Sequence, residues 1–380
     1  MVEMRLTFTL SFVLLLIAAA CIDPYTKNYE FNATLVSIEG LLTDQDPLIV
    51  TVLTSRSVQR TMFEQRQRGA VVELIMSDGP KITLKEGSPG EYSAPDNFRG
   101  KVGVTYRLRV RLTDARIYES TDEKLAAAPP IDKVYAEFNP RGIVSANGFL
   151  KSSSTDVYLD TKDNPAEPNL YMWRTFLYEP QSICGTCENG EWNPAKNECA
   201  SYNLSPVPIP SIITDYECGS RCWEIIGDDR INIFSDALTN GRPITKRLLR
   251  KVPFYENPGA LLYVEQLAVS PTIYKYFNLI KQQSETTGTL TDVAPSPPVG
   301  NVRNINKPDE PVVGYFAAAG AAKTNLWIER SVAGAARTLL LGREPLLDPF
   351  DPYRKLPKFF KVPCLFSRTR TPKAPIGWRF

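Results

Sequence analysis

The sequence predicts a mainly β fold, in which an N-terminal antiparallel β-sandwich module is followed by a second β-rich region with one or few helices. Apolar and polar residues alternate in many short segments, as they do in strands that bury one face. Turn-forming residues separate these segments at regular spacing. The composition agrees, because 31 prolines against five methionines favour strands joined by proline-bearing loops over a helical bundle.

The clearest strand of the first module covers residues 104–113. Its apolar residues, from Tyr106 to Leu112, alternate with arginines at positions 107, 109 and 111. We interpret the arginine row as a solvated outer face, because the exposed face of a half-buried strand carries polar residues. A functional anionic groove is the alternative. The other strands predicted in this module cover residues 32–42, 48–54, 70–76, 81–85 and 91–94.

A domain boundary is predicted at Pro129 and Pro130, because two consecutive prolines prevent a regular element from continuing. The chain is therefore divided into a signal segment (1–20), an N-terminal module (21–128) and a C-terminal region (129–380). The strands predicted in the C-terminal region cover residues 131–138, 157–159, 169–179, 230–236 and 261–269, and an alanine-rich strand follows residues 312–316.

Segment 169–179 is unusually aromatic, with Tyr171, Trp173 and Phe176 among its side chains. We interpret it as the core of a sheet, since aromatic residues at strand spacing bury a large apolar area. An aromatic platform for a ligand is the alternative.

One helix is predicted to begin after Ser270, a good N-cap, with Pro271 in its first position. Apolar residues follow at spacings of three and four, which indicates one buried face. Lys275, Lys281 and Gln282 lie off this stripe, so we expect them to face water.

The N-terminal segment has the pattern of a lipoprotein signal peptide. Arg5 precedes an apolar run that ends in three alanines directly before Cys21. The run is too short for a membrane span, which needs ~20 apolar residues. We therefore predict cleavage after Ala20 and lipid on Cys21, which would be the only membrane anchor of the mature chain. An ordinary secretory signal that leaves a free cysteine is the alternative.

The other six cysteines are predicted to form disulfides, as an even number does in an exported protein. Most of them fall in an insertion, residues 181–222, which is rich in Asn, Gly and Pro and has little apolar periodicity. Such a segment cannot order itself by burial alone, so crosslinks are expected to stabilise it. A zinc site and a redox pair are the weaker alternatives. The candidates are Cys184, Cys187, Cys199, Cys218, Cys222 and Cys364.

Composition excludes several classes of function. The chain has no histidine, which rules out Ser-His-Asp and Cys-His nucleophile systems and the histidine zinc and iron sites. Basic and acidic residues nearly balance, 44 against 42, without long runs of one sign, so no nucleic-acid partner is implied. The sequence has no glycine-rich phosphate loop and no spacing that singles out two carboxylates, so we expect neither catalytic residues nor a cofactor.

Several short segments follow one another in a characteristic order along the chain. None is specific alone, but their order is. They are Cys21 followed by Pro24, then Val36 to Gly40, Gly69 to Val72, Gly90 to Tyr92, Tyr106, Cys222-Trp223, Ser270-Pro271, Gly300-Asn301, Gly314 to Phe316 and Pro375 to Trp378.

In this order the chain resembles the Bacteroidota lipoproteins grouped as the domain of unknown function 4249 family. The resemblance implies an outer-membrane lipoprotein, and since such proteins are often encoded beside TonB-dependent receptors, it implies a receptor-associated role. Asp23, an acidic residue close to the lipidated cysteine, fits surface display in that lineage. The family commonly ends in a cysteine-rich segment, whereas this chain has only Cys364 there.

We therefore expect a non-enzymatic binding or accessory lipoprotein of the outer membrane, with a TonB-dependent receptor as partner. A cell-surface hydrolase of glycans or peptides is one alternative, and it requires two carboxylates that face each other across a cleft. A structural or adhesive surface protein is the other.

Replacing Cys21 with alanine should release the protein from membranes into the soluble fraction, because the lipid on this residue is the predicted anchor. Fractionation of cells followed by immunoblotting measures the distribution, with the wild-type protein as control. Retention of Cys21→Ala in the membrane at the wild-type level would contradict lipidation.

Overall fold

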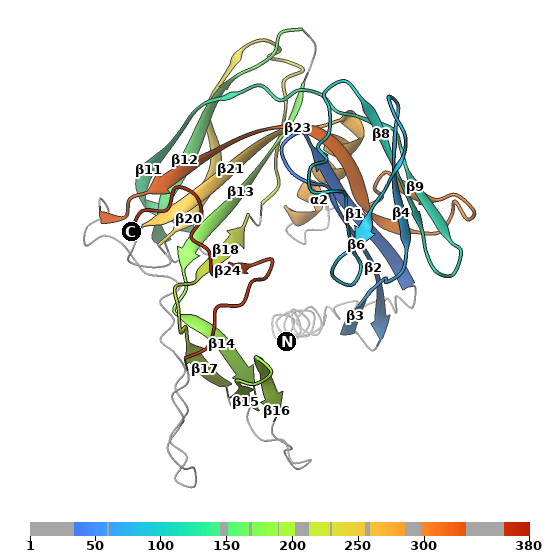
Figure 1. Cartoon of the computed structure of the whole chain (residues 1–380). Coiled ribbons are helices and arrows are strands. Elements are labelled where there is room, and N and C mark those ends of the chain that lie inside the picture. Colours follow the sequence, from blue (N-terminus) through green and yellow to red (C-terminus); the bar gives the residue numbers. More distant parts are fainter. Residues whose placement is uncertain are drawn as a thin grey trace, which may run out of the picture.

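The computed structural model describes residues 34–58, 61–144, 151–166, 169–188, 190–201, 213–228, 230–254, 259–285, 298–331 and 361–380. Within these ranges the protein is mainly β, as predicted, with several sheets and one α-helix (Figure 1). Cys21 and the predicted signal segment lie outside the described residues.

Two sheets face each other in the N-terminal module and enclose an apolar core. Val36, Ile38 and Val50 of one sheet and Val72 and Leu108 of the other are fully buried, as their alternation predicts. The first sheet includes β1 (Thr34–Thr43), β2 (Ile49–Val58), β3 (Thr61–Arg66), β6 (Lys85–Glu86) and β7 (Glu91–Ser93), and the second includes β4 (Val71–Met76), β5 (Ile82–Thr83), β8 (Thr105–Arg111), β9 (Ile117–Ser120) and β10 (Glu123–Lys124).

The arginine row of β8 lies on the outer face of the second sheet, as predicted. Arg107 binds Asp122 through two hydrogen bonds of 2.8 and 2.9 Å, and Arg109 lies 3.3 Å from Glu119 on the neighbouring strand. These arginines are therefore paired across the sheet surface with carboxylates.

The C-terminal region has two layers. A central sheet packs against a three-stranded sheet, and Val157 and Leu159 of the smaller sheet meet Tyr171, Trp173 and Leu177 of the central one. The aromatic segment is thus sheet core on one face, as predicted. The central sheet includes β13 (Leu170–Pro180), β18 (Trp223–Gly227), β19 (Asn232–Ser235), β21 (Ala260–Ala268) and β24 (Arg370–Thr371), and the smaller sheet contains β11 (Ile131–Val144), β12 (Lys151–Lys162) and β20 (Pro243–Pro253).

One long strand, β23 (Val312–Ile328), belongs to both halves of the protein (Figure 1). Its first part, through Ala319, pairs in parallel with β1, and its second part, from Gly320, pairs antiparallel with β21. A single sheet therefore runs from the N-terminal module into the C-terminal region. The preceding strand, β22 (Val302–Asn304), pairs with β9, so the chain after residue 298 returns to the N-terminal module and helps to complete it.

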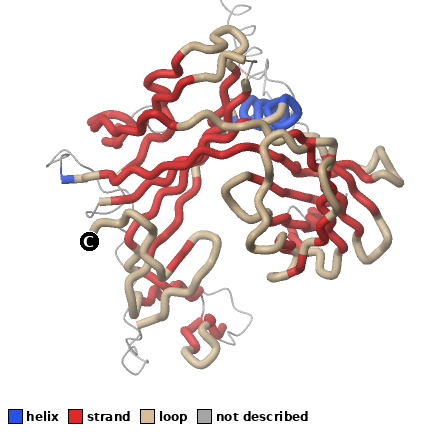
Figure 2. Tube along the Cα trace, turned by 45° about the horizontal axis from the view of Figure 1, so that its top comes forward, coloured by secondary structure: helices blue, strands red, loops and turns tan. Residues whose placement is uncertain are grey.

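Helix α2 (Pro271–Ser284) begins where the sequence predicts. The Ser270 side chain accepts a hydrogen bond of 3.3 Å from the backbone N–H of Ile273, and Pro271 occupies the first turn. Ile273 and Tyr276 are buried against the central sheet. Figure 2 shows the helix as the single prominent blue coil at the junction of the two strand-rich halves.

The cysteine-bearing insertion forms two small hairpin-like sheets that extend away from the central sheet (Figure 1). Trp192 and Tyr216 pack with the crosslinks in a small apolar cluster of their own. The strands are β14 (Ile183–Glu188) with β17 (Ile213–Glu217), and β15 (Gly190–Asn193) with β16 (Glu198–Ser201). All six candidate cysteines form disulfides, which join Cys184 to Cys218, Cys187 to Cys199 and Cys222 to Cys364.

The contact between β1 and β23 requires glycine at position 314. Gly314 has a φ of +99°, and a Cβ added there would lie 2.2 Å from the carbonyl oxygen of Ile38. Both the backbone conformation and the space exclude a side chain.

Gly314→Ala should therefore lower the free energy of unfolding by at least ~2 kcal/mol, measured by urea denaturation. Gly227→Ala is the matched control. Gly227 also lies in a strand of this sheet, and no atom lies within 4 Å of a Cβ added there. An equal effect of the two substitutions would show that the close β1–β23 approach does not limit stability.

Candidate functional site

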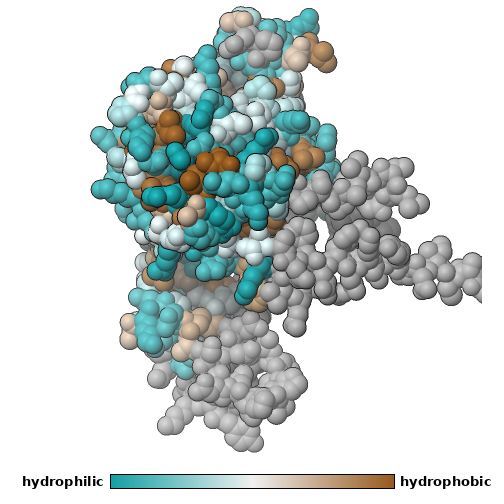
Figure 3. Space-filling view, turned by 90° about the vertical axis from the view of Figure 1, so that its right-hand side faces the viewer, coloured by the Kyte–Doolittle hydropathy of each residue, from teal (hydrophilic) through white to brown (hydrophobic). Residues whose placement is uncertain are grey.

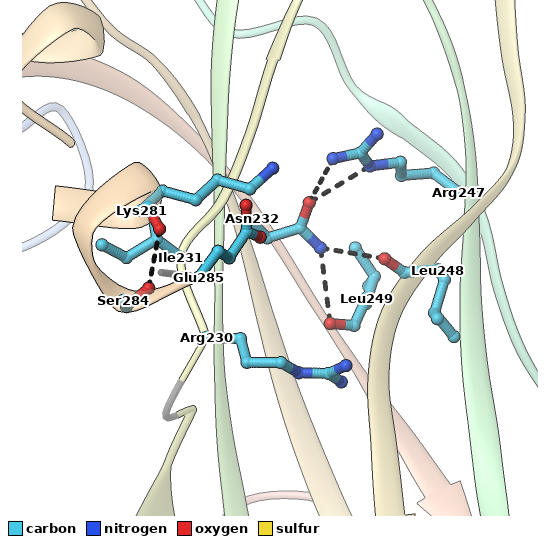
Figure 4. A pocket seen from close by; sticks show the side chains of 9 residues that line it. All are labelled: Arg230, Ile231, Asn232, Arg247, Leu248, Leu249, Lys281, Ser284 and Glu285. Atoms are coloured by element: carbon cyan, nitrogen blue, oxygen red, sulfur yellow. Dashed lines mark hydrogen bonds between the residues drawn. The ribbon is translucent and has the colours of Figure 1, made fainter. Parts of the chain in front are cut away.

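A pocket of about 390 Å³ in the C-terminal region lies between β19, β20 and the C-terminal end of α2 (Figure 4). This volume falls in the ~300–1,000 Å³ range of small-molecule sites. Three of the lining side chains are cationic and one is a carboxylate. The lining residues are Arg230, Ile231, Asn232, Arg247, Leu248, Leu249, Lys281, Ser284 and Glu285.

Arg247 is fixed by neutral groups. Its Nε and Nη2 atoms donate to Oδ1 of Asn232 over 3.1 and 2.6 Å, and Nη2 also donates to the carbonyl of Ile233 over 3.0 Å. The guanidinium carbon lies 5.1 Å from the ring centre of Trp173 and 5.5 Å from that of Phe234. Aromatic rings at these distances attract a cation through their π faces.

Asn232 positions Arg247 and joins two layers of the fold. Its Nδ2 donates to the carbonyl of Leu248 over 2.9 Å and, more weakly, to that of Leu249 over 3.4 Å (Figure 4). The same side chain therefore tethers β19 to β20 and presents its oxygen to the arginine. Leu248 and Leu249 contribute backbone and apolar side-chain surface to the pocket.

Within the described ranges, no carboxylate makes an ion pair with Arg247, and its side-chain hydrogen bonds use Nε and Nη2 and leave Nη1 without an acceptor. Burial lowers the pKa of the Arg247 guanidinium, because a desolvated cation is disfavoured. The same part of the chain also provides no ion pair to Arg230 or Lys281. By contrast, Arg174 and Arg330 are each paired with a glutamate.

The cations come from three separate elements. Arg230 is exposed just before β19, Arg247 is half-buried on β20, and Lys281 is half-buried in the last turn of α2. In Figure 4 the side chain of Lys281 extends past Asn232 toward Arg247. The expectation that Lys281 simply faces water was wrong, since this residue lines the pocket, whereas Lys275 is exposed as expected.

A second pocket of about 250 Å³ shares Arg230, Ile231 and Asn232 with the first. Its remaining wall is mainly apolar and aromatic and comes chiefly from β13, α2 and β23. The side chains that give it this character are Met172, Phe176, Phe277 and Tyr315. Thus an apolar pocket adjoins the basic one, with residues 230–232 as their common wall.

Five of the six candidate disulfide cysteines lie in the insertion and Cys364 lies in the C-terminal segment bonded to it; none of the six lines the basic pocket. The sulfur atoms of Cys184, Cys222 and Cys364 lie within 4.8 Å of one another, a spacing at which thiolates could share a metal ion. All three are in disulfides, however, and a disulfide sulfur lacks the thiolate charge that binds zinc. Cys21 lies outside the described residues.

Several buried carboxyl groups outside the pocket hold the fold together. Glu179 pairs with Arg330, with both side chains almost fully enclosed. Asp163 accepts hydrogen bonds from the Tyr171 hydroxyl and, over 2.6 Å, from the backbone N–H of Gly241. These groups join segments distant in sequence and line none of the pockets described above.

Glu123 is a further buried carboxyl group, and it lies where the two halves meet. Its Oε1 accepts from Thr121 and Asn301 over 3.0 and 2.9 Å. Asn301 in turn binds both the N–H and the carbonyl of Phe316 in β23. Burial raises the pKa of Glu123 above its ordinary value of 4.5, against the opposing effect of these hydrogen bonds.

The arrangement of sheets, insertion and pocket can be compared with known families. A family model described as a domain of unknown function, DUF4249, matches residues 22–325. The chain belongs to this family. The match covers all of the basic pocket and most of β23, whereas the end of β23, the strand β24 and Cys364 lie beyond it.

Searches of curated proteins and of solved structures found no match. Among the helices that the structure describes in this family member, none combines the length and apolar character needed to cross a membrane.

Glu123→Gln should flatten part of the pH dependence of stability. Because the folded state raises the pKa of Glu123, the stabilisation by its neutral form is present below pH ~4.5 and is lost as the pH rises through the folded-state pKa. Glutamine keeps an oxygen for Thr121 and Asn301 but cannot ionise. Urea denaturation between pH 4 and 8 should show the variant gaining stability relative to wild type as the pH increases.

Asp122→Asn is the control with the opposite sign, because Arg107 lowers the pKa of Asp122 through a hydrogen bond. That carboxylate stabilises the fold above its ordinary pKa of 3.8 and loses this effect as the pH falls below that value. In measurements extended below pH 4 its variant should therefore lose stability relative to wild type as the pH rises towards ~4, whereas above pH ~5 the two profiles should run parallel. Parallel pH profiles for Glu123→Gln and wild type would contradict the burial of a titrating carboxyl at the junction.

Proposed function

We propose that the mature protein is a lipid-anchored, non-enzymatic binding or accessory component of the outer membrane that works beside a TonB-dependent receptor. The observation that carries the binding role is the basic pocket, in which a pre-positioned arginine has no carboxylate partner among the described residues. A pocket held by packed strands before any ligand arrives is typical of a binding site.

The anchoring part of the proposal is supported by the N-terminal segment. An apolar run with a preceding arginine ends in small residues directly before Cys21, and the family match begins at the next residue, Ile22. Lipid on Cys21 would keep the folded part close to the membrane, where a receptor could be reached.

The non-enzymatic part of the proposal is supported by the positions and contacts of the carboxyl groups. The buried carboxyl groups Glu123, Glu179 and Asp163 are engaged in contacts between segments, and the basic pocket has Glu285 as its one lining carboxylate. A glycosidase of the usual kind places two carboxyl groups on either side of the bond that it cleaves. The pocket chemistry therefore favours binding of a ligand over cleavage.

The outer surface of the N-terminal module is consistent with exposure to water. Figure 3 shows that the described residues on this face are largely hydrophilic, with apolar side chains in small groups. A face of this kind suits a protein that is held at a membrane by lipid and contacts its partners through limited areas.

Gentle solubilisation of outer membranes and affinity purification of the tagged, lipidated protein should recover a TonB-dependent receptor in stoichiometric amount, identified by mass spectrometry. A second lipoprotein with the same tag and similar abundance is the control for non-specific recovery. Purification of the protein without a receptor would contradict the accessory role and favour a surface protein that acts alone.

A further inference from the structure

The basic pocket carries an excess of positive charge that the described protein does not neutralise. Arg230, Arg247 and Lys281 contribute three positive charges to its wall, and Glu285 contributes one negative charge. Arg247 is half-buried, and Glu285 is exposed at the rim. A desolvated cation without a counter-charge is unfavourable, so an anion that enters the pocket would be stabilised by all three cations.

Arg247 is built to present its guanidinium in one orientation. Asn232 and the carbonyl of Ile233 accept hydrogen bonds from Nε and Nη2, while the guanidinium carbon lies 5.1 Å from the ring centre of Trp173 and 5.5 Å from that of Phe234. Among the residues that the structure describes, none accepts a hydrogen bond from Nη1, which keeps two N–H groups. A guanidinium fixed in this way can still donate charge-assisted hydrogen bonds from Nη1 to the oxygen of an anion.

We infer that this pocket binds a dianionic oxyanion group of a small ligand, either a phosphate monoester or a dicarboxylate, held by Arg230, Arg247 and Lys281. The excess of two positive charges matches a dianion better than a single carboxylate. The ligand class follows from charge and geometry, and the inference rests on the proposed function because it names what the binding protein takes.

The surroundings also indicate where the rest of the ligand lies. Ile231, Leu248 and Leu249 provide apolar surface beside the cations, and the neighbouring pocket with Phe277 and Tyr315 begins behind residues 230–232. A ligand with an anionic group and a compact apolar part would therefore fit better than the free anion. Phenyl phosphate should bind more tightly than inorganic phosphate.

The test is isothermal titration calorimetry with the full mature protein in detergent micelles at low ionic strength. The probes are inorganic phosphate, phenyl phosphate and malonate. Chloride at the same ionic strength is the control. We expect saturable binding of at least one dianion at one site per chain, weakened by added salt. Tighter binding of the phosphates would identify a phosphate ligand, and tighter binding of malonate a dicarboxylate.

Arg230→Gln and Lys281→Gln should each weaken this binding about tenfold, the loss expected for one charge-assisted hydrogen bond of ~1.5 kcal/mol. Neither side chain is fully buried, so both variants should fold, and circular dichroism checks this. Lys275→Gln is the matched control, since Lys275 is exposed on the same helix and outside the pocket. It should bind like wild type.

Absence of saturable binding for every probe, or equal affinity in all three variants, would overturn the inference. The receptor purification described above uses the same wild-type protein without added anions. A receptor recovered together with negative calorimetry would overturn the ligand class alone, whereas calorimetric binding without a receptor would overturn the accessory role alone.

Discussion

The backbone pairing of β23 with both β1 and β21 is the constraint on which the two halves of this protein depend. Parallel pairing on one part of the strand and antiparallel pairing on the next mean that neither half can be displaced without breaking a continuous ladder of hydrogen bonds. Each half has its own apolar core, yet residues of β23 such as Phe316 and Ile328 contribute to one core each. Relative motion of the halves is therefore opposed by the sheet itself.

The small residues of β23 lie where another segment of the chain crosses the strand. The segment that connects the two halves in sequence crosses it, and the backbone N–H of Gly320 donates to the carbonyl of Ala126 over 2.8 Å. A Cβ at Gly320 would lie 2.4 Å from that oxygen. The alanines before Gly320 are likewise buried, so the strand combines close backbone approach with little side-chain volume. Larger residues would force the crossing segment away from the sheet.

Much of the fold could be predicted because single strands carry a local signal. The alternation in β8, the aromatic run in β13 and the capped start of α2 each reflect burial or hydrogen bonding within a few residues. The pairing of β23 with two distant partners has no such signal, since register is decided by residues far apart in sequence.

The strand β20 was not predicted, because bulges interrupt its pairing with β12 and Lys246 adopts a φ of +52°, which breaks the period of two. The basic pocket escaped prediction for a related reason. Its cations come from three elements, and only tertiary packing turns Lys281 from a solvent-facing residue into a lining one.

The disulfide between Cys222 and Cys364 has a consequence for how the chain matures. Its two cysteines are 142 residues apart, so the bond can close only after the chain has been synthesised as far as Cys364. Until then Cys222 is a free thiol close to the sulfur of Cys184, which is already able to bond with Cys218. Attack of a thiolate on a neighbouring disulfide is the elementary step of exchange. The C-terminal segment therefore protects the insertion from rearrangement by capping its last reactive sulfur, and a chain that ended before Cys364 would retain a permanent nucleophile beside its own crosslinks.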